Sequence, residues 1–209
     1  MAPKSIIYFL LTSIFFISCN RESVNVPLSA TSGETEIYDN SPVWFFKKGD
    51  SININKGGLI SSTNWFFAIE KELPLRLIVP NLQKLRTKKK NSIHSKAGTH
   101  NYFVYSDTLA KKNSFFNFDA IHYKYDKHAK QSNALQHILY VNKRTILLDE
   151  KPVTLNELKK KIQETYRKNP KAVIRLYVDE QTNFQEYLAA ALPFEKFAIA
   201  KDSIHYIIQ

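Results

Sequence analysis

The last third of the chain contains a helix whose start and end are both marked in the sequence, and this feature constrains the fold most. Thr154 and Glu157 have the spacing of a capping box, in which each side chain bonds the backbone of the other residue. Apolar or aromatic residues then recur at helical spacing, at Leu155, Leu158, Ile162 and Tyr166. Asn169-Pro170 ends the helix. Because this amphipathic helix must cover a second layer and strand patterns lie on both sides of it, the segment predicts an α+β fold.

The segments around this helix predict a module over residues 131–209. Apolar alternation in HILYV and TILLDE, joined by the turn NKR, predicts a hairpin before the helix. After the helix, AVIRLYVD predicts a strand, Asn183 the N-cap of a short helix, and FEKFAIA and DSIHYIIQ one or two closing strands. The expected order is strand, strand, helix, strand, helix, strand, with the helices on one face of a small mixed sheet.

A second α+β region is predicted over residues 43–130. VWFFKKGDSININK predicts another hairpin, and NWFFAIE, NYFVYSD and SFFNFDAIHYKY are typical of strands. The helical pattern of LPLRLIVPNLQKL contains Pro80, where the helix either begins or kinks. Residues 69–107 are weakly similar to residues 148–179, in the order turn, helix, strand ending in Tyr-x-Asp. This similarity leads to the hypothesis of two related modules in tandem.

The first residues have the organisation of an export signal. Residues 1–4 form a short basic segment. Residues 6–17 form an apolar segment that is shorter than the ~20 residues that a membrane-spanning helix needs. Phe16-Ile17-Ser18-Cys19 resembles the bacterial lipobox, in which a small residue precedes a cysteine that is lipidated and becomes the new N-terminus. The resemblance implies a signal peptide over residues 1–18 and a lipid on Cys19. The alternative is an ordinary cleaved signal or a short uncleaved anchor, in which Cys19 has no role.

Lipidation of Cys19 would determine where the protein works. More than one acyl chain, palmitate among them, gives stable anchoring because each buried methylene contributes about 0.8 kcal/mol. The polar sequence that follows predicts a lipidated N-terminus and flexible tether over residues 19–42. Asn20 is not acidic, which by analogy with lipoprotein sorting favours the outer over the inner membrane of a bacterial envelope. Cys19 is the only cysteine, so the exported domain is expected to fold without disulfides.

The C-terminal module resembles the periplasmic domain of the ExbD/TolR family. The matching residues are the turn Leu148-Asp149-Glu150-Lys151, the helix start Thr154-Leu155, Leu158, Asn169-Pro170, the strand from Val173 to Asp179, Phe184 and Tyr187. Members of that family also have a transmembrane helix with an aspartate in the proton pathway. Residues 5–18 are too short for such a helix and contain no acidic residue. The resemblance therefore implies a periplasmic interaction domain without proton-driven energy transduction.

Few residues have the spacing that catalysis requires. Asp119, His122 and His128 are the weak candidates for a metal site or a hydrolase centre, because zinc takes imidazole and carboxylate ligands. The alternative is a solvated strand end, because His122 alternates with Tyr123 and Tyr125 as strand residues do. Glycine-rich phosphate-binding motifs are absent and the sole cysteine belongs to the anchor. No cofactor and no catalytic residue are therefore predicted.

Basic residues are in excess, with a formal net charge of +11, and they concentrate in one segment. The members of this basic set are Lys84, Arg86, Lys88, Lys89, Lys90 and Lys96. The set is suited to an anionic lipid surface or a cell-wall polymer, at on the order of 1 kcal/mol per cation. The alternative is a solvated helix end, where lysines also favour the helix dipole. The exported location disfavours nucleic acid as a partner.

These features predict a membrane-anchored envelope lipoprotein that binds and does not catalyse. Its contact with the membrane is the lipid on Cys19, and its expected partner is another envelope protein or the cell wall. A homodimer through exposed strand edges is a further expectation. The alternative function is an exported hydrolase or metal-binding protein centred on Asp119, His122 and His128.

Overall fold

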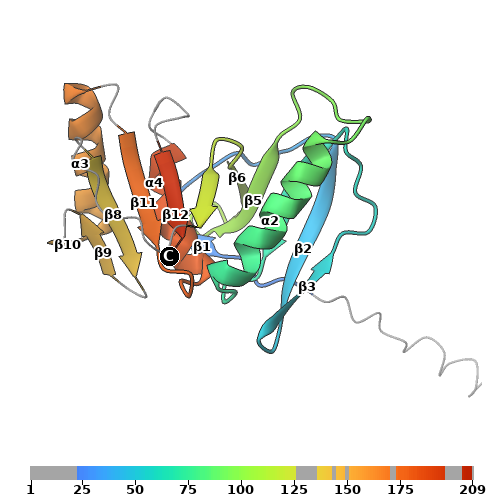
Figure 1. Cartoon of the computed structure of the whole chain (residues 1–209), viewed down its shortest axis with the longest axis horizontal. Coiled ribbons are helices and arrows are strands. Elements are labelled where there is room, and N and C mark those ends of the chain that lie inside the picture. The colour runs from blue at the N-terminus through green and yellow to red at the C-terminus, as the bar shows by residue number, and fades with distance from the viewer. Residues whose placement is uncertain are drawn as a thin grey trace, which may run out of the picture.

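The computed structural model describes residues 23–125, 136–142, 145–148, 151–169, 173–195 and 204–208. These residues form two six-stranded sheets and three helices (Figure 1). Both sheets combine parallel and antiparallel pairs, so the predicted α+β class with mixed sheets is confirmed. No helix within these residues has the length and apolar character needed to cross a bilayer. The signal segment, Cys19 and His128 lie outside the described residues, and what was predicted for them stays a prediction.

The first sheet contains β1 (Leu28–Ser29), β2 (Asn40–Lys48), β3 (Ser51–Asn55), β4 (Asn64–Ile69), β5 (Asn101–Asp107) and β6 (Lys112–Asn117). Its order is β1-β5-β4-β2-β3, and β6 also pairs with β5. β2 and β3 form the predicted hairpin, whereas β2, β4 and β5 run parallel. Ile52 and Ile54 alternate with exposed polar residues on β3, as the period of a strand requires.

The second sheet contains β7 (His122–Tyr125), β8 (Gln136–Asn142), β9 (Thr145–Leu148), β10 (Lys151–Val153), β11 (Val173–Val178) and β12 (Ile204–Ile208). Its order is β10-β9-β8-β11-β12-β7. β8 and β9 form the other predicted hairpin. α3 (Leu155–Lys168) follows β10, and α4 (Phe184–Glu195) connects the parallel strands β11 and β12. The predicted order of elements is confirmed, with the short strand β10 added before α3. FEKFAIA does not begin as a strand, because Phe194 and Glu195 belong to α4, and the rest of that segment lies outside the described residues.

α2 (Leu75–Lys90) lies against one face of the first sheet and resolves the question raised by Pro80 (Figure 1). The helix begins at Leu75, and Pro80 lies inside it. Its buried face contains Leu75, Ile78, Val79, Leu82, Leu85 and Lys89. The predicted helical spacing is therefore confirmed, and one lysine is part of the buried face.

A strand-turn-helix unit occurs in each half of the molecule, and the two units pair with each other. Pro74, directly before α2, forms an antiparallel bridge with Asn183, directly before α4. The first two N–H groups of each helix donate to carbonyl groups of the opposite unit: Leu75 to Thr182 (3.0 Å), Arg76 to Glu180 (2.9 Å), Phe184 to Leu73 (2.9 Å) and Gln185 to Lys71 (3.0 Å). Every bond has a counterpart at the equivalent position, so the arrangement has approximate twofold symmetry. It satisfies N–H groups that a helix start otherwise leaves without a partner.

The observed repeat has a different register from the predicted one. The pairing makes α2 equivalent to α4 and β4 equivalent to β11. The sequence similarity had matched α2 with α3 and β5 with β11 instead. α2 and α3 are both amphipathic, whereas α4 is apolar around most of its surface, so the similarity followed hydrophobic spacing and missed the equivalent helix.

α4 lies between the two sheets, where it contacts β6 of the first and β8 of the second. Its buried residues are Phe184, Tyr187, Leu188, Ala190, Ala191 and Leu192. Phe103 of β5 stacks on Phe118 with ring centroids 3.8 Å apart and lies 5.1 Å from the ring of Phe184. One continuous apolar core therefore connects both halves of the molecule.

Residues 25–34 pack against the first sheet and are not a free tether. β1 pairs with the end of β5, the Lys71 N–H donates to the Asn25 carbonyl (2.9 Å), and Pro27 is buried. A Cβ atom on Gly33 would overlap the Tyr105 hydroxyl and lie 2.9 Å from the Phe115 carbonyl oxygen, so this position requires glycine. The flexible tether predicted over residues 19–42 is therefore wrong for this segment, because polar composition did not reveal backbone hydrogen bonds to distant strands.

The aromatic segment over residues 114–125 is divided between the two sheets. β6 ends at Asn117 and pairs with β5, whereas β7 begins at His122 and pairs with β12. Asp119 lies in the turn between them. The N-terminal region predicted over residues 43–130 therefore contributes its last strand to the second sheet.

Candidate functional site

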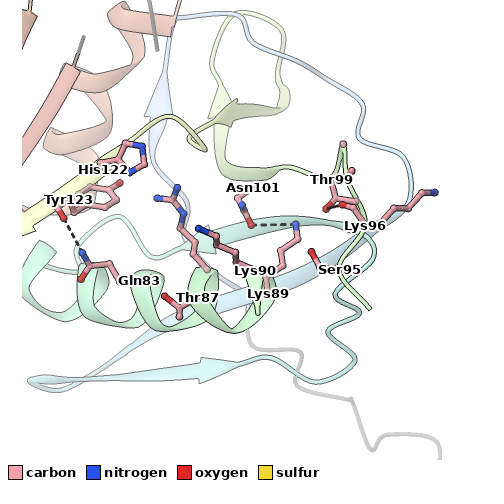
Figure 2. A pocket seen from close by; sticks show the side chains of 13 residues that line it. Gln83, Thr87, Lys89, Lys90, Ser95, Lys96, Thr99, Asn101, His122 and Tyr123 are labelled. Carbon is pink, nitrogen blue, oxygen red and sulfur yellow. Dashed lines mark hydrogen bonds between the residues drawn. The ribbon is translucent and has the colours of Figure 1, made fainter. Parts of the chain in front are cut away.

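A cleft of about 640 Å³ lies beside the last turns of α2 (Figure 2). Its walls come from the second half of α2, the loop of residues 95–99, and the start of β7. His122 and Tyr123 lie at one end of the cleft, and Lys96 and Thr99 lie at the other (Figure 2). The packing of α2 on the first sheet therefore places a helix face next to a strand of the second sheet.

Lys89 is the buried cation of the cleft, with 5% of its surface exposed. Its ammonium group donates to the His100 carbonyl (3.0 Å) and to Asn101 Oδ1 (3.5 Å), and it lies 5.2 Å from the centre of the Trp65 ring. Burial lowers the pKa of Lys89 to about 8, whereas the negative charge of Asp119 acts in the opposite direction. An anion bound near Lys89 would favour its charged form.

Arg86 holds the turn before β7 against α2. Its Nη1 donates to the Ile121 carbonyl and its Nη2 to the Asp119 carbonyl, both at 2.7 Å. The guanidinium carbon lies 5.6 Å from the centre of the Phe118 ring. Arg86 therefore has a structural role in the cleft wall, in addition to its charge.

Asp119 joins the turn after β6 to the start of β5. Its Oδ2 lies 2.8 Å from His100 Nδ1. Its Oδ1 accepts hydrogen bonds from the Asn101 backbone N–H (3.0 Å) and from Asn101 Nδ2 (2.6 Å). Both carboxylate oxygens thus form hydrogen bonds, which position His100 and Asn101. The His100 carbonyl oxygen and Asn101 Oδ1 in turn accept hydrogen bonds from Lys89.

The metal and hydrolase hypothesis placed Asp119, His122 and His128 in one centre. In the described part of the chain Asp119 contacts His100, and His122 lies exposed on β7 at the end of the cleft. The described residues contain no group of three His, Cys, Asp or Glu side chains that could hold a metal. Because His128 lies outside them, the complete centre stays a prediction.

The predicted basic set separates into two groups. Arg86, Lys89, Lys90 and Lys96 line the cleft, whereas Lys84 and Lys88 are exposed on another side of α2. Lys96 borders the cleft, but its amine extends away from Asn101 (Figure 2). Among the described residues, none of the six forms an ion pair. The chain from Leu73 to Ser106 contains no Asp or Glu, and Asp119, whose charge acts on Lys89, comes from the turn before β7.

Sequence analysis did not assign Trp65 or Asn101 to the site. They meet Lys89 because β4 and β5 pair in parallel with Trp65 opposite Asn101. Such proximity depends on the strand register, which no local pattern indicates. The one available signal was the position of His100 next to the strand NYFVYSD, at the end of the basic loop.

Comparison with models of known protein families, with curated proteins and with solved structures finds no match for this chain. The resemblances to the lipobox and to the ExbD/TolR periplasmic domain therefore stay predictions. The chemistry of the cleft is the basis on which a function can be assigned.

Proposed function

We propose that this protein is a lipid-anchored envelope protein that binds an acidic glycan of the cell wall in the cleft beside α2. The lipid on Cys19 holds it at a bacterial membrane, the outer membrane in preference to the inner one. The observation that carries the proposal is a cleft lined by Arg86, Lys89 and Lys90, none of which forms an ion pair within the described residues.

The charge of the cleft favours an anionic ligand. Lys89 is removed from water, and its three described partners are two neutral oxygen atoms and the ring of Trp65. The charge of Asp119 acts on Lys89 without an ion pair between them, and a ligand carboxylate or phosphate would compensate the buried cation further. Lys90 is exposed in the same cleft and supplies a second ammonium group.

The uncharged lining favours a glycan over a protein surface. It contains hydroxyl and amide side chains from Gln83, Thr87, Ser95, Thr99 and Asn101. Such groups match the hydroxyls of a sugar, whereas the core of a protein interface is rich in apolar and aromatic residues. The cleft volume of about 640 Å³ also lies within the usual range for small ligands, roughly 300–1,000 Å³. A short acidic segment of a glycan chain therefore fits the site.

Co-sedimentation of the detergent-extracted protein with isolated, lipid-free cell walls tests the proposal. Lys90→Glu reverses a charge inside the cleft, and we expect it to reduce retention about tenfold, which corresponds to roughly 1.4 kcal/mol. Lys84→Glu reverses a charge on the same helix outside the cleft, and we expect retention within about twofold of the unaltered protein.

Equal losses from Lys90→Glu and Lys84→Glu would reject the cleft as the binding site. Failure of the unaltered protein to sediment with the walls would reject the glycan. In that second case, chemical cross-linking from the cleft to another envelope protein would identify the alternative class of partner.

A further inference from the structure

The loop after α2 exposes an apolar side chain that is close in the sequence to several lysines. Ile93 is 92% exposed, the highest value among the large hydrophobic residues described. Lys84 and Lys88 lie one helical turn apart before it, and Lys96 follows it. Lys84 and Lys88 do not line the cleft, and Lys96 lies at its border with its amine extended away from Asn101 (Figure 2). An exposed isoleucine next to uncompensated lysines is the combination found at membrane-contacting surfaces.

We infer that Ile93, Lys84, Lys88 and Lys96 form a docking surface for the anionic face of a lipid bilayer. The inference rests on the proposed lipid anchor at Cys19, which brings the domain to a membrane. Lysines gain free energy near anionic headgroups, and a single apolar side chain gains by entering the interfacial layer. The docking surface therefore orients the domain, whereas the lipid attaches it.

The length of chain between the anchor and the folded domain supports a bilayer as the occupant. The Lys71 N–H bonds the Asn25 carbonyl, so residues 20–24 alone separate Cys19 from the first residue tied to the domain. Six residue steps span at most about 20 Å. The domain is therefore held close to the membrane surface.

α2 connects the anchored end of the domain to the docking surface. The helix begins at Leu75, a few residues after Lys71, and its 16 residues correspond to a length of about 24 Å. With α2 parallel to the bilayer, Cys19 reaches the membrane near one end of the helix and Ile93 reaches it at the other. Lys84 and Lys88 then lie between these two points on the exposed side of the helix.

Charge and composition favour a bilayer over an acidic protein. No Asp or Glu occurs between Leu73 and Ser106, so no carboxylate of this segment repels anionic lipid. The surface offers one large apolar side chain, which suits shallow insertion into headgroups and is too little for the apolar centre of a protein interface. The cleft opens on a different flank of α2, at Gln83, Thr87 and Lys90, and Lys96 at its border is the one docking residue that also lines it.

A thiol probe at position 93 tests the inference in the full lipidated chain. Cys19 is the only native cysteine and is acylated in the proposed anchor, so Ile93→Cys supplies the only free thiol for an environment-sensitive fluorophore. The labelled protein is reconstituted in phosphatidylcholine vesicles with or without about one-third phosphatidylglycerol. Gln163→Cys on α3 is the control, because that residue is exposed and α3 lies at the opposite end of the molecule (Figure 1).

We expect the emission from position 93 to shift to shorter wavelength in the anionic vesicles and to return at high ionic strength. The control at position 163 should not change. Combined Lys84→Gln, Lys88→Gln and Lys96→Gln substitution should abolish the shift. Lys160→Gln, Lys161→Gln and Lys168→Gln, which remove three exposed charges from α3, should preserve it.

Identical emission at position 93 in both kinds of vesicle would overturn the inference, as would a shift that survives removal of the three docking lysines. Failure of the lipid anchor gives a different result. A Cys19 thiol without lipid would take up the fluorophore, which mass spectrometry detects, and the protein would not float with phosphatidylcholine vesicles. In that case Ile93→Cys is combined with Cys19→Ala, so that position 93 is again the only labelled thiol and its shift in anionic vesicles reports on the docking surface.

Discussion

Pro74 and Asn183 form an antiparallel bridge at the centre of the molecule, each directly before a helix. The carbonyl groups near each of them accept from the first N–H groups of the other helix. α2 has no side-chain cap of its own, so its start depends on the second strand-turn-helix unit. The two halves are therefore expected to unfold together.

Asn183→Ala tests the contribution of this junction. Asn183 Oδ1 accepts from the Glu186 N–H (2.9 Å), and loss of such an N-cap costs about 1 kcal/mol of the free energy of unfolding. Urea unfolding of the detergent-extracted protein, followed by tryptophan fluorescence, measures the change. Asn156→Ala on the exposed surface of α3 is the control and should stay within about 0.5 kcal/mol of the unaltered protein. Equal effects of the two substitutions would show that the cap contributes nothing.

Gly33→Ala should release the N-terminal segment from the first sheet. A Cβ at this position would overlap the Tyr105 hydroxyl and lie 2.9 Å from the Phe115 carbonyl oxygen, so we expect a loss of about 1–3 kcal/mol in the free energy of unfolding. Gly57→Ala is the matched control, because its Cβ would have an ordinary contact of 3.5 Å with Asn55. Limited proteolysis should cut the Gly33→Ala protein before residue 40 faster than the control protein. Equal cleavage rates would contradict the packing of residues 25–34.

Asp119→Ala should loosen the cleft wall. The substitution removes the acceptors of the His100 ring and of two Asn101 N–H groups, so we expect a loss of about 2–3 kcal/mol in the free energy of unfolding. Asp50→Ala, in the exposed turn between β2 and β3, should change it by less than about 0.5 kcal/mol. An unchanged free energy of unfolding in the Asp119→Ala protein would mean that the carboxylate does not position these residues.

The pKa of Lys89 predicts a pH dependence of stability. Burial lowers this pKa from the ordinary lysine value of 10.5 to about 8 in the folded protein, so between these values the unfolded chain binds more protons. The free energy of unfolding should therefore rise with pH across that window, by up to about 1.4 kcal/mol per pH unit from this residue. Lys89→Met keeps the length of the side chain without its charge and should remove this part of the slope. An unchanged slope in the Lys89→Met protein would show that Lys89 titrates normally.

Elements defined by neighbouring residues could be predicted from the sequence. The Thr154–Glu157 capping box is present, with the Glu157 N–H donating to Thr154 Oγ1 (3.3 Å) and Glu157 Oε2 accepting from the Thr154 N–H (2.7 Å). Both hairpins also formed where alternation and turn residues indicated them. Each of these signals lies within a few residues, so no knowledge of the tertiary structure was needed.

Features that depend on distant residues could not be predicted. The N–H groups at the start of α2 (Leu75) and of α4 (Phe184) bond carbonyl groups that precede the other helix, although more than a hundred residues separate the two helix starts. No side-chain pattern in the sequence marks such a backbone-to-backbone bond. Lys89 was assigned to a basic surface because charge runs are usually solvated, yet the pairing of β4 with β5 places it between Trp65 and Asn101. The packing of residues 25–34 was missed for the same reason, since β1 is only two residues long and shows no alternating pattern.

Lipidation of Cys19 is the central claim, because the location, the membrane docking surface and the glycan partner all depend on it. Growth of cells expressing the full chain with a fatty-acid analogue, followed by its detection on the purified protein, measures lipidation directly. We predict incorporation into the unaltered protein and none into Cys19→Ala. Incorporation that persists in Cys19→Ala, or none in the unaltered protein, would contradict the account.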